Sequence, residues 1–178
     1  MIDYDQVFRF VYKDFGLEGY PGSKALFRSK LIERDGNDLS WQKVQARVYA
    51  YEITKAKASS GLIEFLRKNY LKHDLFIVSH KTEFSKIDPN ANLREAALKW
   101  MERNLIFDFI KRDRVFFLSE LDQKVKKIGD LSLDLFVDDL LKVRENQYFP
   151  KTCRFVLFSK SGNSESISDF SNLQDYLS

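Results

Sequence analysis

Two adjacent carboxylates follow a short apolar run in the C-terminal half of the chain. Leu135, Phe136 and Val137 lead directly into Asp138 and Asp139. Such a run is typical of a buried parallel strand, and functional groups in open α/β sheets lie just beyond the carboxyl ends of the strands. Neighbouring carboxylates repel each other, so a hard divalent cation such as Mg²⁺ is their natural ligand. The alternative is a strand end followed by an Asp helix N-cap, which needs no metal.

Two further polar features belong with this carboxylate pair. Ser79 ends the apolar run 75–78, and Lys124 lies on the segment that we expect to form the helix before residues 135–137. A hydroxyl, an ammonium group and two carboxylates are three parts of a site that stabilises a transferring phosphoryl group. Taken singly, Ser79 fits a helix cap equally well, and Lys124 fits a lysine on a helix surface.

The elements that must position these groups are strands alternating with helices. The strands are predicted from apolar runs at Leu75–Val78, Val115–Leu118, Leu135–Val137 and Arg154–Phe158. A helical stripe over 93–110 and a second helix from Ser119 separate them, which favours a parallel sheet with right-handed crossovers. Residues 1–58 carry helical stripes without a strand run. We therefore expect a small all-helical region at 1–58, followed by a Rossmann-like α/β core at 59–178.

The composition restricts the class of protein. Among 178 residues, 44% are hydrophobic, 31% are charged, and 29 basic residues stand against 26 acidic ones, for a net charge of +3. This imbalance is too small to indicate a nucleic-acid partner. No apolar run reaches the roughly 20 residues of a membrane span, and no signal-peptide pattern is present. The single cysteine, Cys153, excludes an intrachain disulfide. We expect a cytoplasmic protein with no membrane partner.

The order of these features resembles the haloacid-dehalogenase-like (HAD) superfamily of aspartate-nucleophile phosphohydrolases. The segments LFIVSHKT (75–82), LDQKVKKI (121–128) and LFVDD (135–139) match its second, third and fourth motifs. The resemblance implies a Rossmann-like core with a helical cap and a phosphorylated small-molecule substrate. Ser79 would then bind phosphoryl oxygens, Lys124 would neutralise charge, and Asp138 and Asp139 would hold Mg²⁺.

Neighbouring residues leave alternatives open at two of these positions. Lys126 and Lys127 lie within one helical turn of Lys124, and either lysine could take its role. His80 and Lys81 follow Ser79 at the strand end, so they are candidates for substrate binding. A histidine in this place could also carry a proton or simply cap the loop that follows.

The chain departs from the family at the first motif. That motif is an apolar strand ending in Asp-x-Asp-x-Thr, which carries the nucleophile. Asp3-Tyr-Asp5 has the spacing, but only Met1 and Ile2 precede it, whereas a central strand has about five residues. We therefore expect that the first central strand is missing and that the chain as written is inactive. We also expect it to be unstable, rescued by another strand, or folded with a rearranged sheet.

Two other functions remain open. One is a non-catalytic, phosphatase-like module that binds a phosphorylated ligand or a partner protein. The other is a receiver-like signalling domain, although such a domain is expected to carry its Asp pair on the first strand rather than the third. The sequence leaves the substrate and the oligomeric state undetermined, and an unpaired central strand edge would favour association.

Overall fold

The computed structural model describes residues 1–159 and 166–177 and divides the chain into two compact units. Unit 1 comprises residues 1–58 and 82–104, and unit 2 comprises residues 59–81 and 105–178. The protein is a mixed α/β structure with small parallel sheets. From the sequence we expect segments 1–58 and 59–178; in the structure, residues 82–104 group with residues 1–58 in unit 1.

Unit 1 is mainly helical. Its helices are α1 (Asp5–Val11), η1 (Tyr12–Phe15), α2 (Lys24–Asp35), α3 (Leu39–Ala46), the π-helical turn η2 (Arg47–Tyr51), η3 (Ile53–Lys55) and α5 (Leu93–Arg103). Two short strands, β1 (Ile2–Asp3) and β2 (Lys57–Ala58), pair antiparallel. The expectation of an all-helical region is therefore corrected by this strand pair, which joins the two ends of segment 1–58.

Aromatic side chains from four helices form the interior of unit 1. The ring of Phe8 in α1 stacks on Trp41 in α3, with centroids 5.8 Å apart and an interplanar angle of 6°. Phe27 of α2 meets Trp41 edge-on at 5.9 Å and is fully buried. Trp100 of α5 is also fully buried, and its indole N–H donates to the carbonyl oxygen of Ala56 at 2.9 Å. These aromatic side chains thus serve packing.

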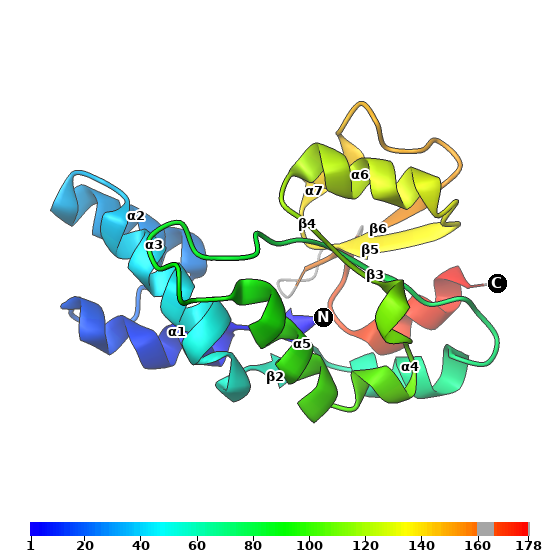
Figure 1. Cartoon of the computed structure of the whole chain (residues 1–178), viewed down its shortest axis with the longest axis horizontal. Coiled ribbons are helices and arrows are strands. Elements are labelled where there is room, and N and C mark those ends of the chain that lie inside the picture. Colours follow the sequence, from blue (N-terminus) through cyan, green and yellow to red (C-terminus); the bar gives the residue numbers. More distant parts are fainter. Residues whose placement is uncertain (160–165, 178) are drawn as a thin grey trace. The chain divides into compact units, whose positions relative to one another are not determined.

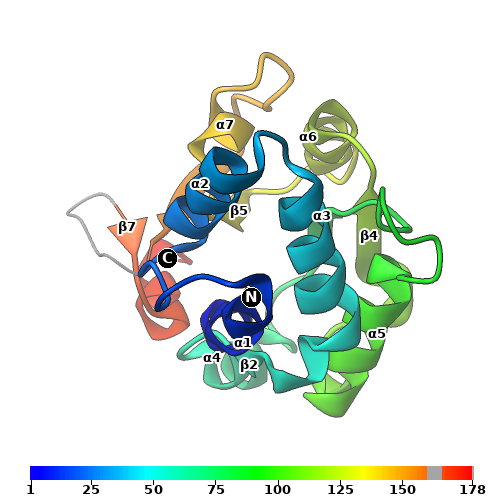
Figure 2. The ribbon, with the colours of Figure 1, turned by 90° about the vertical axis from the view of Figure 1, so that its left-hand side faces the viewer.

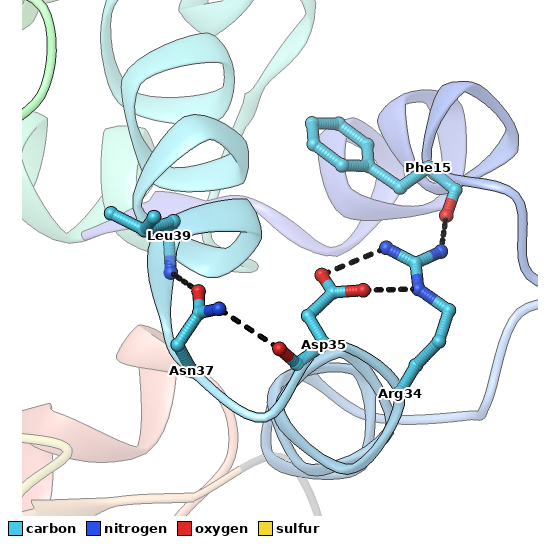
Figure 3. Close-up of polar contacts among 5 residues, drawn as sticks. All are labelled: Phe15, Arg34, Asp35, Asn37 and Leu39. Carbon is cyan, nitrogen blue, oxygen red and sulfur yellow. Dashed lines mark hydrogen bonds and ion pairs between the residues drawn. The ribbon is translucent and has the colours of Figure 1, made fainter.

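The C-terminal end of α2 is closed by a polar turn (Figure 3). The guanidinium of Arg34 binds the carboxylate of Asp35 through Nε at 2.6 Å and Nη2 at 2.9 Å, and it also donates to the carbonyl oxygen of Phe15. Asn37 donates to the carbonyl oxygen of Asp35 and accepts from the backbone N–H of Leu39, both at 2.9 Å. Hydrogen bonding from Arg34 lowers the pKa of Asp35 to about 2.

Unit 2 alternates strands with helices. Its elements are α4 (Leu62–Asn69), β3 (Ile77–His80), η4 (Ile106–Asp108), η5 (Arg112–Arg114), β4 (Val115–Leu118), α6 (Leu121–Asp130), β5 (Leu135–Asp138), α7 (Leu141–Arg144), β6 (Arg154–Phe158), β7 (Ser166–Ile167) and η6 (Phe170–Tyr176). Each of the four apolar runs predicted as strands contains or overlaps one of these strands. The sequence predicts a helix over 93–110, but this helix ends at Arg103. It ends there because the side-chain amide of Asn104 donates to the carbonyl oxygen of Trp100, and because the backbone of Leu105 adopts the left-handed conformation, with φ at 58°.

The strands of unit 2 form two sheets. Strand β3 pairs with β4 in parallel, and β5, β6 and β7 form a second parallel sheet with β6 in the middle. Among the described residues, no strand joins β3 to β5. The single doubly wound sheet expected from the sequence is therefore not present in this part of the chain. The break separates the sheet containing Ser79 from the sheet containing Asp138.

A shared hydrophobic core connects the two sheets of unit 2. Val78 of β3, Val125 and Ile128 of α6, and Phe136 of β5 are all buried in it, together with Val143 of α7. Helix α6 lies on one side of the strands, and α4 and η6 lie on the other (Figures 1 and 2). Within the described ranges, no helix is both long and apolar enough to cross a membrane.

Candidate functional site

The carboxyl ends of β3 and β5 carry most of the polar residues singled out in the sequence. Strand β3 ends with Ser79 and His80, and β5 ends with Asp138. Lys124 reaches this region from α6, the helix that connects β4 to β5. Polar groups at the carboxyl ends of parallel strands are the usual location of a ligand site in α/β proteins.

Lys124 and Asp138 form a buried ion pair. Nζ of Lys124 contacts Oδ2 of Asp138, and the two side chains are 5% and 9% exposed. Helix α6 brings Lys124 inward because the lysine lies beside Val125 and four residues before Ile128, on the helix face that packs on the strands. Buried charges are tolerated when they are paired, so each group accounts for the burial of the other.

The environment of Asp138 acts on its pKa in opposite directions. Burial raises the pKa of the carboxyl above its ordinary value, while the Lys124 ammonium and its hydrogen bond lower it; the neighbouring Asp139 adds a further increase. Burial is the largest of these effects, so the pKa lies above the ordinary range. The second oxygen, Oδ1, accepts from the backbone N–H of Leu140 at 3.0 Å. This contact fixes the turn into α7.

The segment after β3 is tied to the end of β4. The ring nitrogen Nε2 of His80 lies 3.0 Å from the carbonyl oxygen of Ser119. The backbone N–H of Lys81 donates to the carbonyl oxygen of Leu118 at 2.7 Å. The His80 side chain is exposed, and Ser79 is half-buried. Within residues 1–159 and 166–177, no hydrogen bond or ion pair joins Ser79 to Lys124 or Asp138. The structure thus brings Lys124 and Asp138 together, while His80 contacts the β4 end.

The other candidates lie outside the ion pair. Asp139 is exposed. Lys126 lies over the ring of Tyr148 at 4.3 Å, and Lys127 pairs with Asp130 at 3.8 Å. Of the three lysines considered, Lys124 alone contacts Asp138 among the described residues.

Sequence reasoning missed two parts of the site. The ring of Phe136 lies under the ammonium of Lys124, 5.4 Å from Nζ to the ring centroid, and the Leu140 backbone N–H holds Asp138. In the sequence, Phe136 stands out only as an apolar strand residue. The two-residue spacing from Asp138 to Leu140 is the pattern of an Asx turn and could have been recognised.

The acidic residues offer a limited set of metal ligands. In the part of the chain that the structure describes, no group of three or more His, Cys, Asp or Glu side chains is arranged around a common point. Mg²⁺ keeps several waters and is often held by one or two carboxylates together with substrate phosphates. A carboxylate has about four lone-pair positions, of which Asp138 uses two. Asp138 thus keeps acceptor positions beside its contacts with Lys124 and Leu140, and Asp139 is exposed.

Comparisons with protein-family models, with curated proteins and with solved structures found no match to this chain. The fold and the site define a mixed α/β protein with a buried lysine–aspartate pair at the carboxyl end of a parallel strand.

Proposed function

We propose that unit 2 is a phosphoryl-binding domain of the HAD-like phosphohydrolase type, which takes a small phosphorylated metabolite with Mg²⁺. The buried contact between Lys124 and Asp138 at the end of β5 is the main support for this proposal. It brings together an ammonium group and a carboxylate from two segments that resemble separate motifs of one phosphoryl-transfer site.

Each residue has a role that follows from its chemistry. Lys124 has three N–H donors and contacts Asp138; in this proposal its other donors bind a phosphate oxygen. Ser79 contributes a hydroxyl donor from the end of β3. Asp138 and Asp139 would hold Mg²⁺, which neutralises the charge of a phosphate when it is bound.

The same arrangement indicates binding without turnover by these 178 residues. In the described part of unit 2, neither β4 nor β6 ends in a carboxylate that could serve as the nucleophile. Asp3 lies on β1 in unit 1, where its Oδ1 accepts from the backbone N–H of Asp5 at 3.0 Å. We therefore propose that the chain binds a phosphate group and does not hydrolyse the ester by itself.

A second candidate function is a non-catalytic interaction module. One observation favours it: the carboxylate of Asp138 already has a cation partner in Lys124, as expected for an ion pair that only stabilises the fold. The experiment below separates the two functions, because a purely structural pair predicts no binding of phosphate.

The test is calorimetric titration of inorganic phosphate in the presence of Mg²⁺, with a parallel assay of 4-nitrophenyl phosphate hydrolysis. The proposal predicts saturable phosphate binding that is lost in Asp138→Asn and retained in Asp134→Asn. Asp134 is an exposed acid immediately before the first residue of the same strand and is a matched control. Absence of phosphate binding by the parent chain would exclude the proposed function. Asp138-dependent hydrolysis would exclude binding without turnover.

A further inference from the structure

A cleft with a volume of about 310 Å³ lies in unit 2 at the amino ends of β5 and β6. Its walls come from the turn after α4, from the starts of the two strands and from the end of η6. Three lining side chains are charged or titratable and three are apolar or aromatic: His73, Asp134 and Arg154, and Leu135, Tyr176 and Leu177. Small-molecule pockets have volumes of about 300–1,000 Å³, so this cleft suits a small metabolite.

The cleft is separate from the proposed phosphate site. Leu135 begins β5 and Asp138 ends it. A strand rises about 3.3 Å per residue, so these two ends of β5 are about 10 Å apart. A ligand in the cleft therefore does not depend on the proposed phosphate binding.

Pairing of β5 with β6 positions Arg154 at the cleft. The strands are parallel with Leu135 opposite Arg154, and the backbone N–H of Arg154 donates to the carbonyl oxygen of Asp134 at 2.8 Å. Nη1 of the guanidinium donates to the carbonyl oxygen of Tyr176 at 3.1 Å. Within the described ranges, no other hydrogen bond or ion pair engages the guanidinium. Its Nε and Nη2 donors thus remain for a ligand, and such a pair of donors matches a carboxylate.

The carboxylate of Asp134 lines the same cleft without pairing with Arg154. Both side chains are exposed, and among residues 1–159 and 166–177 no side-chain contact of the ion-pair or hydrogen-bond type joins them. In the same part of the chain, the side chains of Asp134 and His73 have no hydrogen-bond partner. A ligand with both a positive and a negative charge can therefore bridge Arg154 and Asp134 without displacing a contact between them.

The lining residues select the class of ligand. The formal charges of Arg154 and Asp134 cancel, so electrostatic complementarity favours a zwitterion over a dianion such as phosphate. The side chains of Leu135 and Leu177 are half-buried and offer apolar surface to the rest of the ligand. An α-amino acid with an aliphatic side chain combines the three required features: a carboxylate, an ammonium group and an apolar part.

We infer that unit 2 binds an α-amino acid with an aliphatic side chain in this cleft. The α-carboxylate accepts from Nε and Nη2 of Arg154, and the α-ammonium donates to the carboxylate of Asp134. The aliphatic side chain lies against Leu135 and Leu177.

The test is an NMR titration of the ¹⁵N-labelled 178-residue chain with L-leucine. The amide resonances of Leu135, Arg154 and Leu177 are expected to shift with one dissociation constant. N-acetyl-L-leucine lacks the ammonium group and L-leucinamide lacks the carboxylate, so each should bind at least about tenfold more weakly. Glycine keeps both charges but lacks the apolar side chain, and it should also bind about tenfold more weakly.

Two chain variants assign each charge of the ligand to its partner. Arg154→Lys keeps the positive charge but loses the paired donors, so it should weaken L-leucine binding about tenfold and leave L-leucinamide binding unchanged. Asp134→Asn removes the carboxylate, so it should weaken L-leucine binding about tenfold and leave N-acetyl-L-leucine binding unchanged. Arg144→Gln, at an exposed arginine of α7, is the control and should bind L-leucine like the parent chain.

The ligand series needs only the parent chain, so the test does not depend on the folding of a variant. The inference is overturned if L-leucine causes no saturable shifts at the cleft. It is also overturned if N-acetyl-L-leucine, L-leucinamide or glycine binds as tightly as L-leucine, or if folded Arg154→Lys and Asp134→Asn bind L-leucine like the parent chain.

Discussion

Nζ of Lys124 in α6 contacts Oδ2 of Asp138 at the end of β5, and both side chains are less than one-tenth exposed. Removing one partner of such a pair leaves the other charge buried without compensation. The ion pair therefore links the stability of unit 2 to the groups that we propose for phosphate binding.

Lys124→Met is expected to lower the free energy of unfolding by about 3–5 kcal/mol, because the Asp138 carboxylate loses its buried counter-ion. Urea unfolding followed by circular dichroism measures this loss. Lys126→Met is the matched control on the same helix: Lys126 is exposed and lies over Tyr148, so its loss should cost less than about 1 kcal/mol. Equal effects of the two substitutions would show that the ion pair does not stabilise the fold.

Replacing both partners with apolar residues tests the same pair in a different way. Lys124→Met combined with Asp138→Leu leaves no buried charge, so the double variant should be more stable than Lys124→Met alone. The measurement is a double-mutant cycle of unfolding free energies, including each single variant. Additive effects of the two substitutions would contradict direct coupling.

We expect alanine substitutions at Gly61 and Gly129 to change the stability of the protein in opposite directions. Gly61 precedes α4 with φ at +71°, and a Cβ there would lie 2.6 Å from the backbone nitrogen of Ser171 and against the Asp169 carboxylate. Gly61→Ala should therefore destabilise the protein by about 1–3 kcal/mol. Gly129 is inside α6 with nothing within 4 Å of a Cβ, so Gly129→Ala should stabilise by about 0.4–1 kcal/mol. Thermal unfolding of both variants checks the signs.

Burial protects the thiol of Cys153. The side chain lies in the hydrophobic core of unit 2, and burial raises its pKa to about 11. At about pH 8 the native thiol should therefore react with iodoacetamide about two orders of magnitude more slowly than the urea-unfolded chain. Mass spectrometry of the alkylated protein gives both rates. Rapid alkylation in native buffer would mean that the core around Cys153 is open.

The sequence predicted local elements better than their assembly. The four apolar runs predict strand positions because a buried strand needs little more than a short apolar segment between turns. The division of the strands into two sheets depends on pairing between distant segments, which apolar periodicity does not encode. Likewise, the spacing of Lys124 and Asp138 in the sequence does not determine that their side chains meet. They meet because Lys124 is buried beside Val125 on the inner face of α6.

Because of Asp35, we expect the stability of the protein to fall as the pH is lowered through the acid range. Its folded-state pKa of about 2 lies below the unfolded value of roughly 4, so its contribution is present above pH 4 and is lost as the pH falls toward 2. Asp35→Asn should therefore reduce the slope of stability against pH in this window. Urea unfolding at several acid pH values measures the slope, and an unchanged slope would show that the Arg34–Asp35 contact of Figure 3 is not maintained in solution.

The most direct test of the account is an NMR titration of the ¹⁵N-labelled chain with inorganic phosphate in the presence of Mg²⁺. We predict that the backbone amide resonances of Ser79, Lys124 and Leu140 shift together with one dissociation constant, and that Lys126→Met leaves this response unchanged. Lys124→Met should abolish the shifts, with circular dichroism confirming that the variant is folded; if it is not, Asp138→Asn replaces it. Unshifted resonances at these three positions, or shifts that saturate independently of one another, would contradict a phosphate site at the carboxyl ends of β3 and β5.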